Sequence, residues 1–334
     1  MTDKRPARSA AATALLAAAV IAVPMAGNSY HLHMVCLIGI NVISATGLNL
    51  LTGCAGLVSL GHAAFMGVGA YGVAWFGTHL GLPFYLCLPL GGLLAAGVGM
   101  IAGLPSFRLK GLYLAIASLA AQFILSFVFN EWEPVTGGRS GVTLAPAEIA
   151  GLRLTTEREM YYLIAVITVA ALLFARNLFR TRVGRAFIAL RDRDIAAEVL
   201  GVDLRRYKLM AFGVSSFYAG VAGGLMAYFF KVVAPGQFGF QFSLFFLAAI
   251  VVGGLGTVQG AVLGAIFMTM TPEVLSWVAG PFGPVATGFL APVREVLFGL
   301  LIIVFLIFEP RGLVGIGSRV RSWHPRSWAQ RRSR

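Results

Sequence analysis

Few residues in this 334-residue chain have side chains that could do chemistry, and one group of them interrupts a strongly apolar region. Asn49, Ser59 and His62 lie close together between long runs of Leu, Ile, Val and Ala. An imidazole among amide and hydroxyl groups could relay protons or line a polar path. A lone histidine in such a region is more often a hydrogen-bonded structural group. These three residues are therefore candidates for a translocation path, with a purely structural role as the alternative.

Two glycine-rich stretches, 53–69 and 253–264, are the next candidates. Glycine adopts backbone conformations that other residues avoid, so a cluster of glycines can break a helix. We expect the second stretch, where the short apolar runs 243–256 and 258–277 meet, to form broken or re-entrant helices. Gly253, Gly254 and Gly256 are accordingly further candidates for the translocation path.

A polar segment from Gly184 to Asp203 is the most informative part of the sequence. Asp192 and Asp194 are predicted N-caps of a short helix, and Gly201 is a natural stop at its C-terminal end. Asp203 can then cap the following helix. Because a short helix isolated between apolar runs is marginal alone, we expect it to dock on another protein. A solvated linker is the alternative.

Several kinds of chemistry are not predicted. The four lysines (Lys4, Lys110, Lys208 and Lys231) are not followed by Ser or Thr, so the sequence has no Gly-x4-Gly-Lys-Ser/Thr phosphate-binding loop. The three cysteines (Cys36, Cys54 and Cys87) lie within apolar runs at unrelated spacings, which favours small buried hydrophobic residues over a disulfide framework or a metal site. We therefore predict no catalytic residue, no cofactor and no metal.

The surrounding composition indicates a membrane protein. Hydrophobic residues make up 58% of the chain and charged residues only 12%, about half the usual charged share of roughly 25%. The mean hydropathy is +0.83. The net charge of +13 comes from basic blocks between apolar runs, so the bilayer, and not a nucleic acid, is the expected partner of these charges.

Apolar runs close to the roughly 20 residues needed to cross a bilayer recur along the whole sequence. They predict an all-α, polytopic transmembrane helical bundle of about ten helices. The candidate spans are 10–27, 33–52, 56–79, 82–104, 111–130, 160–178, 209–230, 243–256, 258–277 and 290–308. The first resembles a secretory signal peptide, but no convincing cleavage site follows, so we interpret it as an uncleaved helix.

The distribution of Lys and Arg gives the expected orientation. Ten crossings with a cytoplasmic N-terminus place 21 of the 26 basic residues in the cytoplasm, as the positive-inside rule requires. The five placed outside are Arg139, Arg153, Arg158, Lys231 and Arg294. We therefore expect a transmembrane domain over 1–308, an external loop at 131–159, a cytoplasmic loop at 180–208 and a basic cytoplasmic tail at 309–334.

A stand-alone secondary transporter or channel is the main alternative of a different class. Proton-coupled transporters generally need ionisable groups within the membrane, and the predicted helices hold almost none: Glu273, Arg294 and Glu295 fall near predicted membrane ends. This scarcity, and the isolated docking segment, favour a permease driven by separate subunits.

Seven stretches, in matching order, resemble the branched-chain amino-acid ABC transporter permease family, specifically its LivM-like half. They are Gly47–Gly53, Ala55–Phe65, Lys110–Ile116, Thr136–Gly138, Gly184–Asp192, Val252–Thr257 and Glu309–Leu313. Cys54 stands where the family frequently has an aromatic residue, and Arg139-Ser140 follows Thr136-Gly-Gly where an acidic or amide residue is common. Importers of urea, amides and aromatic acids look similar, so the substrate stays open.

The resemblance implies a multi-pass subunit of the bacterial inner membrane, and the distribution of Lys and Arg predicts that both termini are cytoplasmic. It implies three kinds of partner: a second permease forming a heterodimer, two cytoplasmic ATPase subunits, and an external or periplasmic solute-binding protein. It also implies that Ala196-Ala-Glu198 with Gly201 belongs to the loop that grips the ATPase. The predicted ATPase-coupling residues are Gly184, Arg185, Arg191, Asp192, Asp194, Ala196, Ala197, Glu198 and Gly201.

Overall fold

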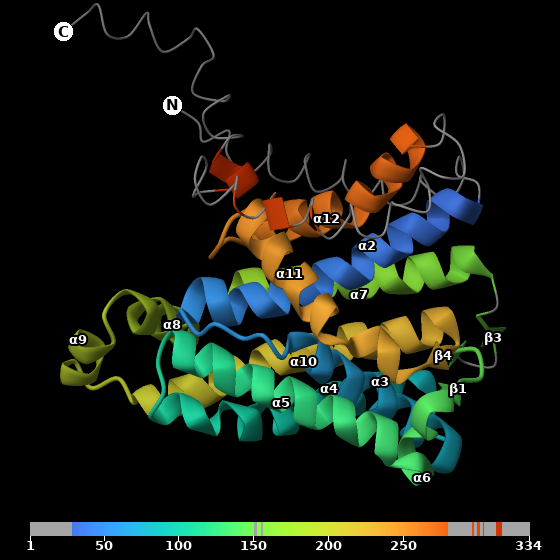
Figure 1. The fold of residues 1–334 in the computed structure, drawn as a ribbon, viewed down its shortest axis with the longest axis horizontal. Coiled ribbons are helices and arrows are strands. Elements are labelled where there is room, and N and C mark those ends of the chain that lie inside the picture. The colour runs from blue at the N-terminus through green and yellow to red at the C-terminus, as the bar shows by residue number, and fades with distance from the viewer. Residues whose placement is uncertain are drawn as a thin grey trace, which may run out of the picture.

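The computed structural model describes residues 29–149, 152–154 and 156–279, and also positions 296, 299, 300, 303 and 312–315. Within these residues the chain is a bundle of helices with a few very short strands (Figure 1). The predicted spans at 10–27 and 290–308 and the predicted tail lie wholly or almost wholly outside the described residues.

The helices follow the predicted spans closely. The longer ones are α2 (Ser29–Leu48), α3 (His62–His79), α4 (Phe84–Gly103), α5 (Leu112–Glu131), α7 (Glu157–Leu178), α10 (Leu204–Phe230), α11 (Phe240–Gly253) and α12 (Val258–Ala279). Between α7 and α10 lie α8 (Arg182–Asp192) and α9 (Asp194–Val199). Shorter elements are η1 (Asn49–Cys54), η2 (Leu104–Phe107), α6 (Glu133–Thr136), η3 (Gly138–Ser140) and η4 (Pro235–Phe238).

Six helical segments within the described part are long and apolar enough to cross a membrane. They are Ser29–Cys54, Phe84–Phe107, Leu112–Glu131, Glu157–Leu178, Leu204–Phe230 and Pro235–Gly253. A membrane-spanning helical bundle is thus confirmed, while the total of ten crossings stays a prediction.

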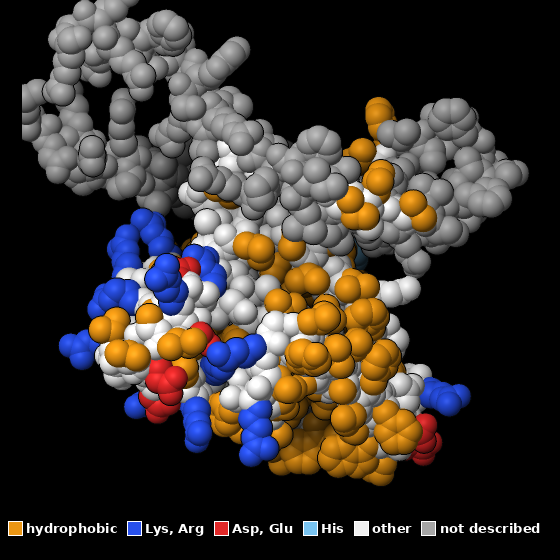
Figure 2. Space-filling model, turned by 60° about the vertical axis from the view of Figure 1, so that its left-hand side comes forward, with side chains coloured by type: hydrophobic (Ala, Val, Ile, Leu, Met, Phe, Trp, Pro, Cys, Tyr) orange, Lys and Arg blue, Asp and Glu red, His pale blue; other side chains and the backbone are white. Residues whose placement is uncertain are grey.

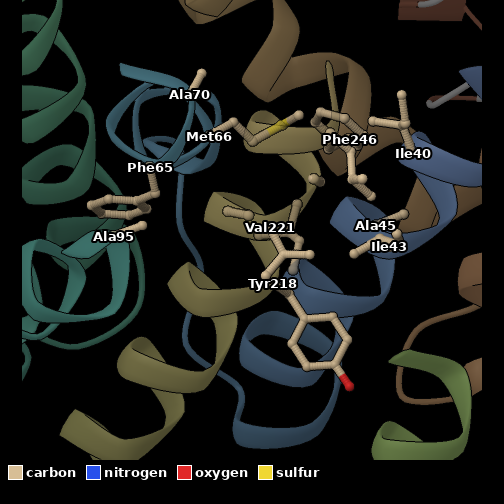
Figure 3. Packing of buried hydrophobic residues seen from close by; sticks show 14 of the residues in the cluster. Ile40, Ile43, Ala45, Phe65, Met66, Ala70, Ala95, Tyr218, Val221 and Phe246 are labelled. Carbon is tan, nitrogen blue, oxygen red and sulfur yellow. The ribbon is translucent and has the colours of Figure 1, made fainter. Parts of the chain in front are cut away.

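Helix α10 is the centre of the bundle and packs on α2, α3 and α4. Small residues permit this packing: a Cβ at Gly69 of α3 would overlap the backbone of Gly220, and one at Gly99 of α4 would overlap Ser216. Lipid tails are as apolar as the helix surfaces, so the hydrophobic effect does not drive helices together in a membrane. Close packing of their backbones stabilises the contact instead. Figure 3 shows the resulting core, where Tyr218 and Val221 lie among side chains of α2, α3, α4 and α11.

Two helices are broken in a related way. Helix α2 continues into the π-helix η1, and after a non-helical stretch α3 begins at His62; α10 is followed by a non-helical stretch and η4 before α11. The starts of α3 and α11 meet, since the Ala63 amide donates to the Ser243 hydroxyl over 2.9 Å. From there α3 runs towards the end of α10 that holds Tyr228, whereas α11 runs towards Gly53.

The two ends of the bundle differ. At one end, α8 and α9 lie beyond the long helices, on the left of Figure 1. At the other, β1 (Val142–Thr143) pairs antiparallel with β4 (Val232–Val233), and β2 (Glu148–Ile149) pairs with β3 (Leu152–Arg153). We refer to these as the α9 end and the β1 end.

Candidate coupling and translocation site

Two glycine turns from distant parts of the sequence lie against each other towards the α9 end. The first, residues 53–56, begins with the last two residues of η1, and the second, residues 253–257, joins α11 to α12. A Cβ at Gly53 would overlap the Gly256 amide nitrogen, so the two backbones touch. Gly56 (φ +70°) and Gly256 (φ +77°) are left-handed, a conformation that favours glycine. The predicted break at Gly253, Gly254 and Gly256 is confirmed here, and the turn at 53–56 packs against it to form a single junction.

Asn49 ties the two turns together. Its Nδ2 donates to the Thr257 carbonyl over 2.7 Å, and its Oδ1 accepts from the Gly256 amide over 2.8 Å. The side chain is 3% exposed. This one amide side chain therefore joins the end of η1 to two backbone groups in the connection between α11 and α12.

Arg191 reaches the same junction from the last turn of α8. Its Nη1 donates to the Gly53 carbonyl over 2.9 Å, and its Nε donates to the Asp192 carboxylate over 3.0 Å. A Cβ at Gly256 would stand 2.9 Å from Nη1. Residues predicted separately for coupling and for the translocation path are therefore in contact.

His62 and Ser59, two other predicted path residues, are fully buried within this chain. His62 Nε2 lies 3.0 Å from the Ser44 carbonyl oxygen and 3.1 Å from its hydroxyl, and the ring meets Phe246 edge-on. The Ser59 hydroxyl accepts from the Gly61 amide at 3.4 Å. These contacts support the structural alternative for both residues.

The start of α3 depends on three polar residues that the sequence analysis did not single out. The free amides near a helix N-terminus need acceptors, and they find them on neighbouring helices. Leu60 donates to Ser118 Oγ over 2.8 Å, Ala63 to Ser243 Oγ, and Ala64 to Gln122 Oε1 over 3.0 Å. Isolated polar residues within predicted apolar spans, such as Gln122 at 111–130, were the available signal.

The α8–α9 segment is folded, but its caps differ from the prediction. The Thr181 hydroxyl caps α8 by accepting from the Gly184 amide, and Asp192 lies in the last turn of α8, so its predicted N-cap role is wrong. Asp194 begins α9, whose N-cap position is Arg193, so Asp194 is not an N-cap either. Gly201 has φ +84°, as the predicted stop requires. Asp203 caps α10 by accepting from the Arg206 amide, as predicted.

The residues predicted for ATPase coupling divide between an inner and an outer face. Gly184 is buried, and a Cβ there would overlap the Leu178 carbonyl oxygen; Ala197 is also buried, at 3% exposure. Ala196, Glu198 and Gly201 are exposed, as is Arg185, which donates to the Arg180 carbonyl over 3.1 Å.

An apolar tip on α9, defined by Ile195, Val199 and Leu200, faces outward. Their exposed fractions are 72%, 83% and 84%. The sequence analysis did not single out these three residues, although they alternate with the predicted ones. Figure 2 shows hydrophobic side chains among Lys and Arg at one end of the molecule, beside a broad apolar flank.

Two lysines fasten this end to the bundle. Lys110, ahead of α5, pairs with the Asp194 carboxylate. That hydrogen bond holds the pKa of Asp194 below its ordinary value. Lys208 of α10 is buried and donates to the Ser106 carbonyl over 2.9 Å. The three cysteines all lie in the described part of the chain and are buried, as predicted.

Residues 30–306 match the profile of a family described as the permease component of the branched-chain amino acid transport system. The high-affinity branched-chain amino acid transport system permease protein LivM of Escherichia coli (strain K12) is 34% identical over 299 residues, which cover 82% of this chain and 68% of that protein. The autoinducer 2 import system permease protein LsrC of Enterobacter sp. (strain 638) is 30% identical over 248 residues, 71% of each. Among solved structures, PsaBC from Streptococcus pneumoniae in complex with Fab aligns with a TM-score of 0.44 and 16% identity, covering 88% of this chain and 97% of that one.

Proposed function

The chain belongs to the family of branched-chain amino acid transport system permease components, and we propose that it forms the LivM-like half of an ATP-driven importer's membrane pair. In this role it passes branched-chain amino acids into the cytoplasm. The match over residues 30–306 carries the proposal. Hydrolysis of ATP belongs to partner subunits, and this chain supplies part of the moving path.

The assembly we propose holds a second, related permease, two ATPase subunits and an external solute-binding protein. The apolar α9 tip supports the ATPase contact, because three aliphatic side chains more than 70% exposed are unfavourable in water unless a partner covers them. Arg193 and Glu198 flank this tip with exposed charges. An apolar groove with a polar rim on the ATPase would match it.

The orientation we propose places the α9 end in the cytoplasm and the β1 end outside. The exposed arginines of the α9 end support it, since positively charged loops stay on the cytoplasmic side. Ten crossings of the bacterial inner membrane, with the predicted spans 10–27 and 290–308 as first and last, leave both termini in the cytoplasm.

The external loop 131–159 and the short loop 231–242 receive the binding protein in this proposal. Glu131 and Glu133 are exposed there, and the pairing of β1 with β4 joins the two loops. Lysine at both glutamates should weaken docking of the binding protein while leaving membrane insertion intact. Arg182→Glu, at the opposite end, is the control and should leave docking unchanged. Unchanged docking in the double variant would refute this surface.

Co-purification and uptake test the function. The tagged chain, expressed with its partner permease and ATPases, should purify with ATPase subunits and, in proteoliposomes with binding protein, take up leucine. A chain that purifies without ATPases, or transports leucine without them, would favour the secondary-transporter alternative. Thermal-shift screening of the binding protein with leucine, urea, amides and aromatic acids would establish the substrate class.

A further inference from the structure

Arg191 donates a hydrogen bond from the predicted cytoplasmic loop, 180–208, to one of the glycine turns. Among the described residues of that loop, it is the only one whose side chain does so. Its acceptor is the Gly53 carbonyl, at the end of η1. Carbonyls at a helix C-terminus lack intrahelical donors and carry the negative end of the helix dipole. A guanidinium is the side chain best suited to such an acceptor, because it stays charged and has several donors.

The turns are shaped around this arginine. A Cβ at Gly56 would stand 3.0 Å from Arg191 Cγ, so the aliphatic stem lies against the first turn. A Cβ at Gly256 would stand 2.9 Å from Nη1, so the guanidinium lies beside the second turn. Arg191 therefore lies against the end of η1 and against Gly256 in the α11–α12 connection at once.

Each turn adjoins a break between helices. Turn 53–56 precedes the non-helical stretch that enters α3, and turn 253–257 ends α11. Asn49 holds the turns to each other through hydrogen bonds on both sides. A displacement of α8 thus has a direct route to α3 and α11, two helices that begin side by side and run to opposite ends.

We propose that Arg191 is the positioning residue through which movement of α8 and α9 reaches both glycine turns. This inference rests on the proposed function, because it takes the ATPase to act on α9. The two lysines at this end have other partners: Lys110 joins the segment ahead of α5 to Asp194 of α9, and Lys208 joins α10 to the Ser106 carbonyl.

The test compares Arg191→Met, which keeps a stem of similar bulk without donors, with Arg191→Lys, which keeps one donor. Arg182→Gln, at the far end of the same helix, is the matched control. Each assembled transporter is reconstituted, and leucine uptake is measured against ATP hydrolysed. Arg191→Met should lower uptake per ATP about tenfold, as expected for loss of a charge-assisted hydrogen bond. Arg191→Lys should retain most of the coupling, and Arg182→Gln all of it.

Hydrogen exchange separates transmission from mere stability. On adding ATP and vanadate, the wild-type complex should change exchange at 53–60 as well as at 184–201, whereas Arg191→Met should change it only at 184–201. Wild-type uptake per ATP in Arg191→Met, or an uptake loss that only matches a loss of folded complex, would overturn the inference. If the wild-type chain binds no ATPase, the proposed function itself fails, which is a separate result.

Discussion

Asn49 shows how a single side chain can hold a break within a membrane bundle. It bonds the Gly256 amide and the Thr257 carbonyl, two backbone groups of the connection between α11 and α12. The sequence identified Asn49 as a polar residue at membrane depth, but its partners are more than 200 positions away. Contacts of that range follow from the packing of glycine turns, which residue types alone do not specify.

Replacing Asn49 by Ala should destabilise the chain by about 2 kcal/mol, because it removes two partly buried hydrogen bonds that join the two glycine turns. Thermal unfolding of the purified protein would measure this. Asn177→Ala, at an exposed position near the end of α7, is the control and should leave the unfolding temperature unchanged. An Asn49→Ala protein as stable as the wild type would show that these hydrogen bonds contribute nothing.

The Asp194–Lys110 pair makes a prediction about pH. Hydrogen bonding from Lys110 lowers the pKa of Asp194 below its ordinary value of 3.8. A carboxyl group with a lowered folded-state pKa contributes stability above its unfolded pKa and loses it as pH falls through the folded value. The contribution of this pair to the protection of α9 in hydrogen exchange should therefore not change between about pH 5 and pH 8. Asp194→Asn should lower the protection of α9 by the same amount across this range. A change in α9 protection near neutral pH that occurs in the wild type but not in Asp194→Asn would contradict the assignment.

Most helices could be predicted from the sequence, because apolar runs of membrane length have one plausible structure. Predicted spans such as 82–104 and 111–130 agree with α4 and α5 to within a few residues. The sequence did not predict that α3 begins only at His62, after a non-helical stretch. Hydropathy cannot detect such a break, because it does not show which other helices pack against it. The freed amides donate to Ser118, Gln122 and Ser243 on those helices.

The α8–α9 segment was predicted in its place but not in its detail. Its stop at Gly201 was confirmed, whereas the capping residue of α8 is Thr181. The apolar tip was missed because its three residues face outward only in the folded segment, where Ala197 turns inward.

Gly201→Val should strain the left-handed stop by about 1 kcal/mol or more, because a β-branched residue disfavours positive φ. The chain should still insert, but ATPase binding or uptake per ATP should fall. Gly201→Asn is the control at the same position, since Asn tolerates this conformation better, and it should stay close to the wild type. Equal activity of both variants would remove the stop from the coupling role.

The molecule as a whole places its proposed working parts at opposite ends. Cysteine labelling in a background without the native cysteines tests the orientation: a membrane-impermeant reagent added outside should label Ala145→Cys, at an exposed position of the β1 end. It should not label Ile195→Cys in the α9 tip, or Ser327→Cys in the tail, until the membrane is permeabilised. Labelling of the tail from outside would contradict the even number of crossings.

The energy source of transport tests the central claim most directly. Proteoliposomes holding the chain, its partner permease and the ATPases would be supplied with binding protein, leucine and ATP, with and without ionophores that dissipate ion gradients. The importer proposed here should accumulate leucine against its gradient only with hydrolysable ATP, and ionophores should not matter. Accumulation that persists with an inactive ATPase and collapses with the ion gradient would contradict the account.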